Sequence, residues 1–448
     1  MRKPQIIIIG GNAAGPSAAA KAKRVNPEAD VILFEASPFI STGTCELPYL
    51  FSNVIDDYKK LVFFSPEQFF EEKKVRVNVN HKVESINRRE KTVQVVNQID
   101  KSSISVPYDK LIITTGSVAK MPANLSYAKN LFTLKSISDY IRISEYLCQN
   151  NVKNIIILGA GYIGIETAEN LKAMDYNVHL IEKDSVPMPS SEKEISALVK
   201  DKLEKEKVET TYGFVGLKFN CRDEKITTIN IDGRIIDTCL VISAIGVEPN
   251  SSLAISSKLK VGKYNGITVD GKLKTTDPNI FAAGDCIEIK NTITNKHDYL
   301  PLATLAHEQG HIAGENAAGG NVFYDSVVKN VAVKIFDNVL VSVGLTSIDA
   351  SSNNFRVRSV DAILPNLVKV MPESKNTYGK IIYEEGSRRI LGAEFYGQSE
   401  VIGYGDLISA LISKNDKIDS LTKINFNYTP PNSPFINILS YLGRKALK

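Results

Sequence analysis

One cysteine occupies a sequence context that suits chemistry better than packing. Cys45 lies in the stretch ISTGTCELPYLF, residues 40–51, which is a polar turn containing a glycine. A thiol becomes a good nucleophile as its thiolate, and a polar turn can stabilise that form. With no second cysteine nearby, the sulfur must form a mixed disulfide or persulfide with an outside partner, or become a sulfenic acid. The alternative is a structural thiol, an interpretation that stays open for the other cysteines, Cys148, Cys221, Cys239 and Cys286.

A glycine turn in the middle of the chain predicts a dinucleotide site. The letters GAGYIG stand between a β-branched run and a helix-forming segment. In such a turn the first glycine makes the bend, the second admits a pyrophosphate and the third lets the helix pack on the strand. Glu182 ends the next predicted strand, where an acid accepts a ribose hydroxyl and favours NADH, whereas Lys183 favours NADPH. The predicted contacts are Gly159, Gly161, Tyr162, Ile163, Gly164 and Glu182.

A second, looser glycine turn stands near the N-terminus. It reads GGNAAG after the run IIII, and Asn12 replaces the middle glycine. Glu35 ends the following predicted strand and restores the dinucleotide pattern. Two dinucleotide folds in one chain indicate two dinucleotides, and a flavin with a nicotinamide is the usual pair because hydride must pass between them. The predicted contacts are Gly10, Gly11, Asn12, Ala13, Ala14, Gly15 and Glu35.

Further segments fit a bound FAD. The segment LIITTGSVAKMP, residues 111–122, is a strand ending in Thr-Gly, and TTDPNIFAAGDCIEI, residues 275–289, ends a strand on Gly-Asp. An acid at the second position can bind the ribitol hydroxyls. Each segment alone could be an ordinary turn, but their order in one chain supports the flavin. The predicted contacts are Ser41, Thr115, Gly116, Gly246, Gly284, Asp285 and Ala303.

Composition excludes several classes of function. The 448 residues carry 54 basic and 50 acidic side chains without a long basic block, so nucleic acid is not the expected partner. No apolar run has the length of a membrane span. The cysteines are odd in number, scattered and without metal-ligand spacing, which indicates a reducing compartment, the cytoplasm, and no metal site. The expected fold class is α/β, with two Rossmann-like units and an α+β unit after about residue 325.

These motifs together resemble the flavoprotein pyridine nucleotide–disulfide oxidoreductases over nearly the whole chain. Within that family the chain is similar to the single-cysteine branch of coenzyme A-disulfide reductases, NADH oxidases, NADH peroxidases and persulfide reductases. The resemblance implies a glutathione-reductase-like fold and a homodimer. It also implies an FAD-binding domain at 1–117 and 246–325, an NAD(P)H-binding domain at 118–245 and a dimerisation domain at 326–448.

The cysteine turn and the first glycine turn bear on the reaction. The branch has S-F-x-x-C-x-L-P-Y beside the flavin, and here Ser41 and Cys45 match, while Thr42 and Glu46 depart from the pattern. Oxidases and peroxidases of the branch usually have a histidine where this chain has Ala13. Without an imidazole, peroxide cleavage loses its expected helper, which favours reduction of a disulfide or persulfide.

The resemblance implies three further roles. Tyr428, in NYTPP, would reach the partner subunit's active site and protonate a leaving thiolate, although a tyrosine packed in a proline-rich corner is the alternative. Glu166 would lie near the flavin N5 edge, and Tyr162 would cover the flavin until nicotinamide displaces it. Either of these two could instead be helix surface or packing. His307 receives no role.

Basic side chains near the first helix suggest a phosphorylated thiol as substrate. Arg24 and Lys73 match positions that contact CoA phosphates in coenzyme A-disulfide reductases, and Lys21 is nearby, although exposed cations are often only solvated. Glu46 counts against an anionic ligand. The sequence thus predicts an FAD-dependent NAD(P)H:disulfide oxidoreductase acting on CoA disulfide, with CoA as a bound thiol. The alternatives are a persulfide or polysulfide reductase, an NADH oxidase or peroxidase, and a redox sensor without enzymatic activity.

Overall fold

The first glycine turn is carried by a parallel sheet whose central strand is the predicted IIII run. The computed structural model describes residues 3–123, 125 and 127–448. β-branched residues buried on both faces favour a central parallel strand, and residues 6–9 are all buried. The sheet order is β21 (Ile280–Ala282), β9 (Lys110–Ile113), β1 (Gln5–Ile9), β2 (Asp30–Phe34) and β5 (Arg76–Asn78).

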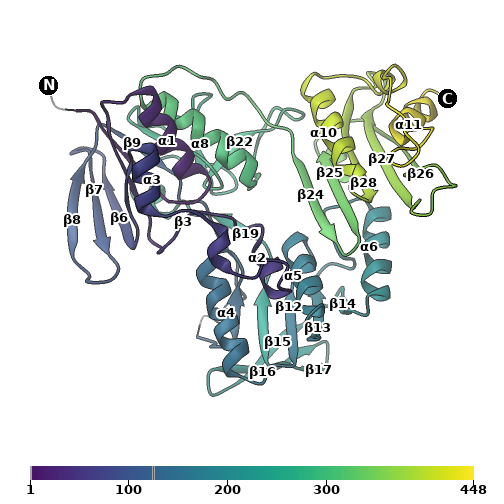
Figure 1. The fold of residues 1–448 in the computed structure, drawn as a ribbon, viewed down its shortest axis with the longest axis horizontal. Coiled ribbons are helices and arrows are strands. Elements are labelled where there is room, and N and C mark those ends of the chain that lie inside the picture. The colour runs from purple at the N-terminus through teal and green to yellow at the C-terminus, as the bar shows by residue number, and fades with distance from the viewer. Residues whose placement is uncertain (1–2, 124, 126) are drawn as a thin grey trace.

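Two helices lie side by side on this sheet, α1 (Ala14–Val25) and α8 (Ala303–Ala317), as Figure 1 shows. Glycines on α8 allow the backbones to touch. A Cβ at Gly310 would lie 2.2 Å from the Ala14 oxygen, and one at Gly314 would lie 2.2 Å from the Ala18 oxygen. This close packing places the part of α8 around Gly310 beside the start of α1, where the first glycine turn ends.

The second glycine turn is carried by a sheet of the same design. Its order is β11 (Leu131–Thr133), β18 (Leu240–Ser243), β12 (Asn154–Leu158), β13 (Asn177–Glu182) and β14 (Glu209–Tyr212), and all pairs are parallel. Each of the two parallel-sheet units also holds a three-stranded antiparallel sheet. These sheets are β6 (His81–Asn87), β7 (Thr92–Asn97) and β8 (Ser103–Pro107), and β15 (Leu217–Arg222), β16 (Lys225–Ile231) and β17 (Arg234–Asp237).

A two-stranded ribbon links the two units. The strand β10 (Ser117–Ala119) pairs antiparallel with β19 (Val247–Pro249). Gly116 and Gly246 precede these strands with φ of +68° and +99°, a conformation that favours glycine. The predicted boundaries at 117/118 and 245/246 fall at this ribbon, and the domain limits stay a prediction.

The C-terminal unit is an antiparallel sheet with order β24 (Asn330–Ile335), β25 (Asn338–Gly344), β28 (Ile390–Gly397), β27 (Asn376–Glu384) and β26 (Val357–Pro365). Helices α10 (Glu400–Ser413) and α11 (Ile438–Ala446) cover one face. The other face supplies Leu340, Tyr378 and Tyr396 to a core shared with the second unit. Figure 1 shows these yellow-green strands against the second unit. The predicted fold class is confirmed.

The remaining elements are short connections or flanking helices. These elements are β3 (Ile40–Thr42), α2 (Leu47–Phe51), η1 (Tyr58–Leu61), β4 (Val62–Phe64), α3 (Pro66–Lys73), α4 (Ile137–Gln149), α5 (Tyr162–Lys172), α6 (Lys193–Lys205), α7 (Ser252–Ser256), β20 (Ile267–Thr268), β22 (Ile287–Lys290), β23 (His297–Asp298), α9 (Ser347–Ser352) and η2 (Ile418–Thr422). Among the described residues, no helix combines the length and apolar composition that crossing a membrane requires.

Candidate active site

The helices that follow the two glycine turns begin with backbone N–H groups that no side chain caps within the described residues. The N-cap residues are Ala13 for α1 and Gly161 for α5. Helices α3, α4 and α9 each begin with a capping box, whereas α6, α8 and α10 also lack a side-chain cap in the described part of the chain, so the preceding glycine turns are what distinguish α1 and α5. Free N–H groups and the positive end of the helix dipole favour a phosphate. Both turns therefore fit the pyrophosphate of a dinucleotide.

Steric contacts explain why these turns need glycine. A Cβ at Gly15 would lie 1.8 Å from the Gly10 oxygen, and one at Gly164 would lie 2.0 Å from the Gly159 oxygen, so helix and strand touch. At Gly161, in contrast, a Cβ would meet no described atom within 4 Å. That position faces open space, as expected where a ligand approaches the backbone.

The two acids at the strand ends have matching environments. Glu35 Oε2 accepts a 2.6 Å hydrogen bond from the Gly11 N–H, and Glu182 Oε2 accepts a 2.8 Å bond from the Ala160 N–H. These bonds hold each carboxylate beside its glycine turn. Each oxygen keeps a second lone pair, so both acids fit the predicted contact with ribose hydroxyls.

The cysteine turn is tied directly to the first glycine turn. The Ser41 N–H donates to the Gly11 oxygen at 2.7 Å, and Thr42 Oγ1 donates to Asn12 Oδ1 at 3.1 Å. Ser41 has φ of +51°, a left-handed conformation that these bonds stabilise. Asn12, which weakens the glycine pattern, thereby fixes the strand that leads to Cys45.

All five cysteines, which lie in the described part of the chain, are free thiols. The Cys45 side chain reaches solvent, although protein surrounds much of it. Burial, then Glu46 and Glu166, raise the pKa of Cys45, and Lys135 acts in the opposite direction. Cys286 is fully buried and burial raises its pKa to about 11, as expected for a structural thiol.

Glu166 lies on the α5 face that meets the cysteine turn. Tyr49 Oη donates a 3.0 Å hydrogen bond to Glu166 Oε1. Burial raises the pKa of Glu166 to about 7, and the Tyr49 hydrogen bond offsets this only in part. A carboxyl group that titrates near neutrality beside a thiol can give and take protons. Tyr49 stands at the tyrosine of the S-F-x-x-C-x-L-P-Y pattern, but that pattern predicts no contact with Glu166.

Asp285 and Lys135 form an ion pair near Cys45. Ser117 Oγ donates to Asp285 Oδ2 at 2.9 Å, and Lys135 Nζ lies 3.3 Å from the same oxygen. Gly284, with φ of +82°, turns the chain at this point. The carboxylate is held at the end of β21, which fits the predicted ribitol contact. Lys135 could not be singled out from the sequence, because it is a single lysine outside any motif.

Tyr162 packs toward the C-terminal unit, and its role in covering the flavin stays a prediction. Its ring packs into the core shared with the C-terminal unit, and its buried hydroxyl has no hydrogen-bond partner among the described residues. Burial raises the pKa of the Tyr162 phenol, Glu394 of the C-terminal sheet raises it further, and Ser342 of the same sheet lowers it.

The three predicted substrate-binding cations differ in their surroundings. Lys21 pairs with Glu315 at 2.9 Å, and Lys73 pairs with Glu72 at 3.2 Å. Arg24 is exposed and makes no ion pair with any described residue. Of the three, Arg24 is the cation most available to an anionic ligand.

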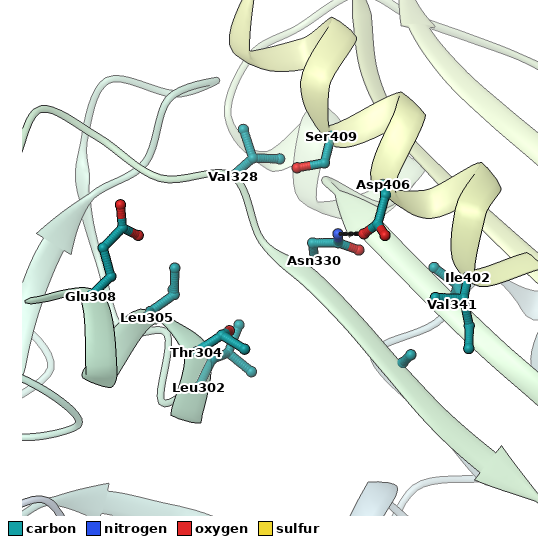
Figure 2. A pocket seen from close by; sticks show the side chains of 11 residues that line it. Leu302, Thr304, Leu305, Glu308, Val328, Asn330, Val341, Ile402, Asp406 and Ser409 are labelled. Atoms are coloured by element: carbon teal, nitrogen blue, oxygen red, sulfur yellow. Dashed lines mark hydrogen bonds between the residues drawn. The ribbon is translucent and has the colours of Figure 1, made fainter. Parts of the chain in front are cut away.

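A cavity of about 430 Å³ lies where the start of α8 faces the C-terminal unit. Figure 2 shows Leu302, Thr304 and Glu308 on the α8 side and Asn330 and Asp406 on the other. Ala303 is exposed at the first turn of α8, next to two of these lining residues. The cavity is thus adjacent to the predicted flavin contact.

Tyr428 lies in the loop before α11. Its ring meets Phe435 edge to face at 5.5 Å between centroids. The side chains are 48% and 78% exposed, so the pair is not packed into a corner of its own chain. An exposed aromatic pair is suited to contact with another protein surface.

The fold and the two dinucleotide turns define the class, and comparison with known proteins identifies the family. Residues 4–310 match the model of the pyridine nucleotide-disulphide oxidoreductases, so the chain belongs to that family. Family members use FAD and NAD(P)H, and the two cradles described above fit these groups. The predicted family and cofactors are confirmed.

Individual relatives cover nearly the whole chain. It is 28% identical to a coenzyme A disulfide reductase of Staphylococcus aureus (strain bovine RF122 / ET3-1) over 99% of this chain and 100% of that protein. It is 29% identical to an NAD(P)H coenzyme A polysulfide/persulfide reductase of Pyrococcus horikoshii, over 99% and 98%. Reduced CoADR-RHD of Bacillus anthracis has a TM-score of 0.95 at 29% identity, over 100% of this chain and 80% of that one.

Proposed function

We propose that this enzyme reduces a low-molecular-weight disulfide, CoA disulfide first, with electrons from NAD(P)H and with Cys45 as its single redox cysteine. The observation that carries the proposal is the bonding of the cysteine turn to the first glycine turn through Asn12 and Thr42. It holds one accessible thiol beside a dinucleotide cradle. The names of the relatives from Staphylococcus and Pyrococcus support a sulfur substrate.

The sulfur chemistry needs one thiolate. The Cys45 thiolate attacks one sulfur of R–S–S–R, which forms Cys45–S–S–R and releases RS⁻. Two electrons then break the new S–S bond, restoring the thiolate and releasing the second RS⁻. The sum is NAD(P)H + H⁺ + RSSR giving NAD(P)⁺ + 2 RSH. FAD, when bound, supplies the two-electron link between nicotinamide and sulfur.

Three side chains assist this cycle. Burial, Glu46 and Glu166 raise the pKa of Cys45, and the charge of Lys135 opposes this rise and so favours the attacking thiolate. Glu166, with a pKa of about 7 and a hydrogen bond from Tyr49, exchanges a proton beside the sulfur. Arg24, exposed and unpaired among the described residues, meets a phosphate of the substrate.

The active enzyme is proposed to be a cytoplasmic homodimer. The exposed apolar side chains Tyr428, Phe435 and Ile436 gather on one loop of the C-terminal unit. In the dimer, Tyr428 of one subunit would protonate the thiolate that leaves the other subunit's site.

A persulfide or polysulfide is the second candidate substrate, and Glu46 is the observation that favours it. Its carboxylate raises the pKa of the neighbouring thiol and repels an anionic substrate. The same residues would perform the chemistry on a smaller sulfur species.

The test is anaerobic NADH oxidation by wild type and Cys45→Ser with CoA disulfide, polysulfide or a small organic disulfide, together with an aerobic control. The proposal expects Cys45-dependent turnover to be fastest with CoA disulfide. Preference for polysulfide would establish the second candidate. Turnover that requires air and survives Cys45→Ser would overturn both and leave an oxidase.

A further inference from the structure

A row of polar side chains crosses the face of the C-terminal sheet that meets the second unit. Ser342 on β25 and Lys380 on β27 each pair in register with Glu394 on β28. Directly opposed residues on neighbouring strands point to the same face. All three side chains are buried, with exposures of 2%, 7% and 1% in the same order.

The second unit covers this row with the beginning of α6. The Glu192 N–H, at the N-cap, donates to Glu394 Oε2 at 2.8 Å. Lys380 Nζ lies 2.6 Å from Glu192 and 2.9 Å from Glu194. The lysine is therefore occupied by two carboxylates, and Glu394 is held by a backbone group.

The Glu394 carboxyl group has no ion-pair partner in this cluster of described residues. Within the described residues, no cation contacts it, and its Oε1 is buried without a hydrogen-bond partner. An uncompensated carboxylate at such a depth is costly, so the group retains its proton instead. Burial raises the pKa of Glu394, and the Glu192 backbone and the Ser342 hydroxyl offset this only in part. Because Oε2 already accepts a bond, the proton belongs on Oε1.

A second orphaned group meets the same row. The Tyr162 hydroxyl is buried without a partner in the described part of the chain. The Ser342 hydroxyl lowers the pKa of both the Tyr162 phenol and the Glu394 carboxyl group, against the larger effect of burial. A protonated acid, a serine and a phenol offer three donors and three acceptors, which is sufficient for a closed hydrogen-bonded set.

We propose that protonated Glu394, acting through Ser342, is a positioning residue for Tyr162, and through it for the nucleotide-binding turn. Tyr162 is the first residue of α5 and directly follows Gly161, whose backbone faces open space. Anchoring the phenol therefore fixes the helix end that would bind the pyrophosphate. The inference rests on the proposed dinucleotide site at that turn.

The arrangement makes nucleotide binding sensitive to ionisation of Glu394. Loss of its proton would add another negative charge beside Glu192, whose lysine partner Lys380 is already shared with Glu194, and this would disrupt the anchor. Nucleotide affinity should then fall at alkaline pH. The charged and titratable groups that face Glu394 are Glu192 and Glu194 from α6, Lys380 from β27, Lys329 before β24, Tyr162 from α5 and Tyr378 from β27.

The experiment compares wild type, Glu394→Gln, Glu394→Ala and the control Glu194→Gln as FAD-loaded enzymes. NADH dissociation constants are measured by nucleotide fluorescence across pH, without an acceptor. Glu394→Gln should keep the affinity and remove its alkaline decline, and Glu394→Ala should weaken binding about tenfold at all pH values, as for one lost buried anchor. Glu194→Gln, which neutralises a half-buried carboxylate of the same cluster, should keep the wild-type profile.

A second readout does not need the nucleotide. Nitration of Tyr162 by tetranitromethane, located by peptide mass spectrometry, should increase with pH in wild type more than in Glu394→Gln, and should be fast in Glu394→Ala. Equal nitration and equal NADH profiles in wild type and Glu394→Gln would overturn the proposal. If nitration behaves as expected but NADH does not bind, the link between Glu394 and Tyr162 is supported and the proposed dinucleotide site is wrong.

Discussion

The Tyr49 hydroxyl donates a 3.0 Å hydrogen bond to Glu166, and this contact joins the cysteine-bearing turn to α5, the helix that follows the second glycine turn. A second bond, 2.5 Å from Ser52 Oγ to Asn170 Oδ1, lies on the same two helices. The reactive thiol is therefore positioned by both units: Asn12 holds its strand from one side, and Glu166 holds the following helix from the other.

Replacing Glu166 by Gln should remove a proton-exchanging group and keep the shape of the contact. We expect turnover with a disulfide to fall about a hundredfold, the usual size of a lost general acid or base. The pH profile of turnover should also lose an inflection near pH 7, because the pKa of Glu166 is about 7. An unchanged profile in Glu166→Gln would mean that another group carries the proton.

The same carboxyl should affect stability in a defined pH window. The pKa of Glu166 is raised from 4.5 to about 7 in the folded protein. Its contribution is therefore fully present below pH about 4.5 and is lost as the pH rises through about 7. Melting temperatures of the wild type should thus fall relative to Glu166→Gln across this window. A constant difference between the two proteins would show that Glu166 does not retain a raised pKa.

Lys135 should promote ionisation of Cys45. Lys135→Met removes the cation that lowers the pKa of the thiol, so alkylation of Cys45 by iodoacetamide at neutral pH should slow about three- to tenfold. Lys135→Arg keeps the charge and serves as the control, and FAD content is checked because Lys135 also pairs with Asp285. Equal alkylation rates in the Met and Arg variants would show that Lys135 does not promote ionisation of Cys45.

The two glycines of the second turn should respond differently to alanine. Gly164→Ala would place a Cβ 2.0 Å from the Gly159 oxygen and should destabilise the fold by ~1–3 kcal/mol, the usual cost of overpacking. Gly161→Ala meets no described atom within 4 Å and should fold normally, yet hinder the approach of the nucleotide. Thermal unfolding and the KM for NADH separate the two effects. Normal NADH binding by Gly161→Ala would place the nucleotide elsewhere.

Tyr428 should act across the subunit boundary. Cys45→Ser and Tyr428→Phe homodimers should each have low activity, but mixing them under exchange conditions should form hybrids with one intact site. Activity should then recover to about a quarter of the wild type if half of the dimers are hybrid, since each has one working site of two. No recovery, with hybrid formation verified by mass spectrometry, would place Tyr428 outside the partner's site.

Local motifs made most of the fold predictable. The runs around Ile6–Ile9 and the GAGYIG turn specify strand, bend and helix within one short segment, so both parallel sheets could be predicted. The packing of Tyr162 could not, because the core that it packs against includes Leu340 and Tyr396, which lie far along the chain on two strands. Lys135 was missed for a similar reason: its effect on Cys45 arises only when the two units are packed together.

The most direct test is the mass of the Cys45 peptide after anaerobic incubation with CoA disulfide, before and after one equivalent of NADH. The account predicts a CoA mixed disulfide on Cys45 that NADH removes, with release of one CoA thiol per site and oxidation of one NADH. An unmodified Cys45 peptide in a protein that still oxidises NADH with CoA disulfide would contradict the central role of this cysteine.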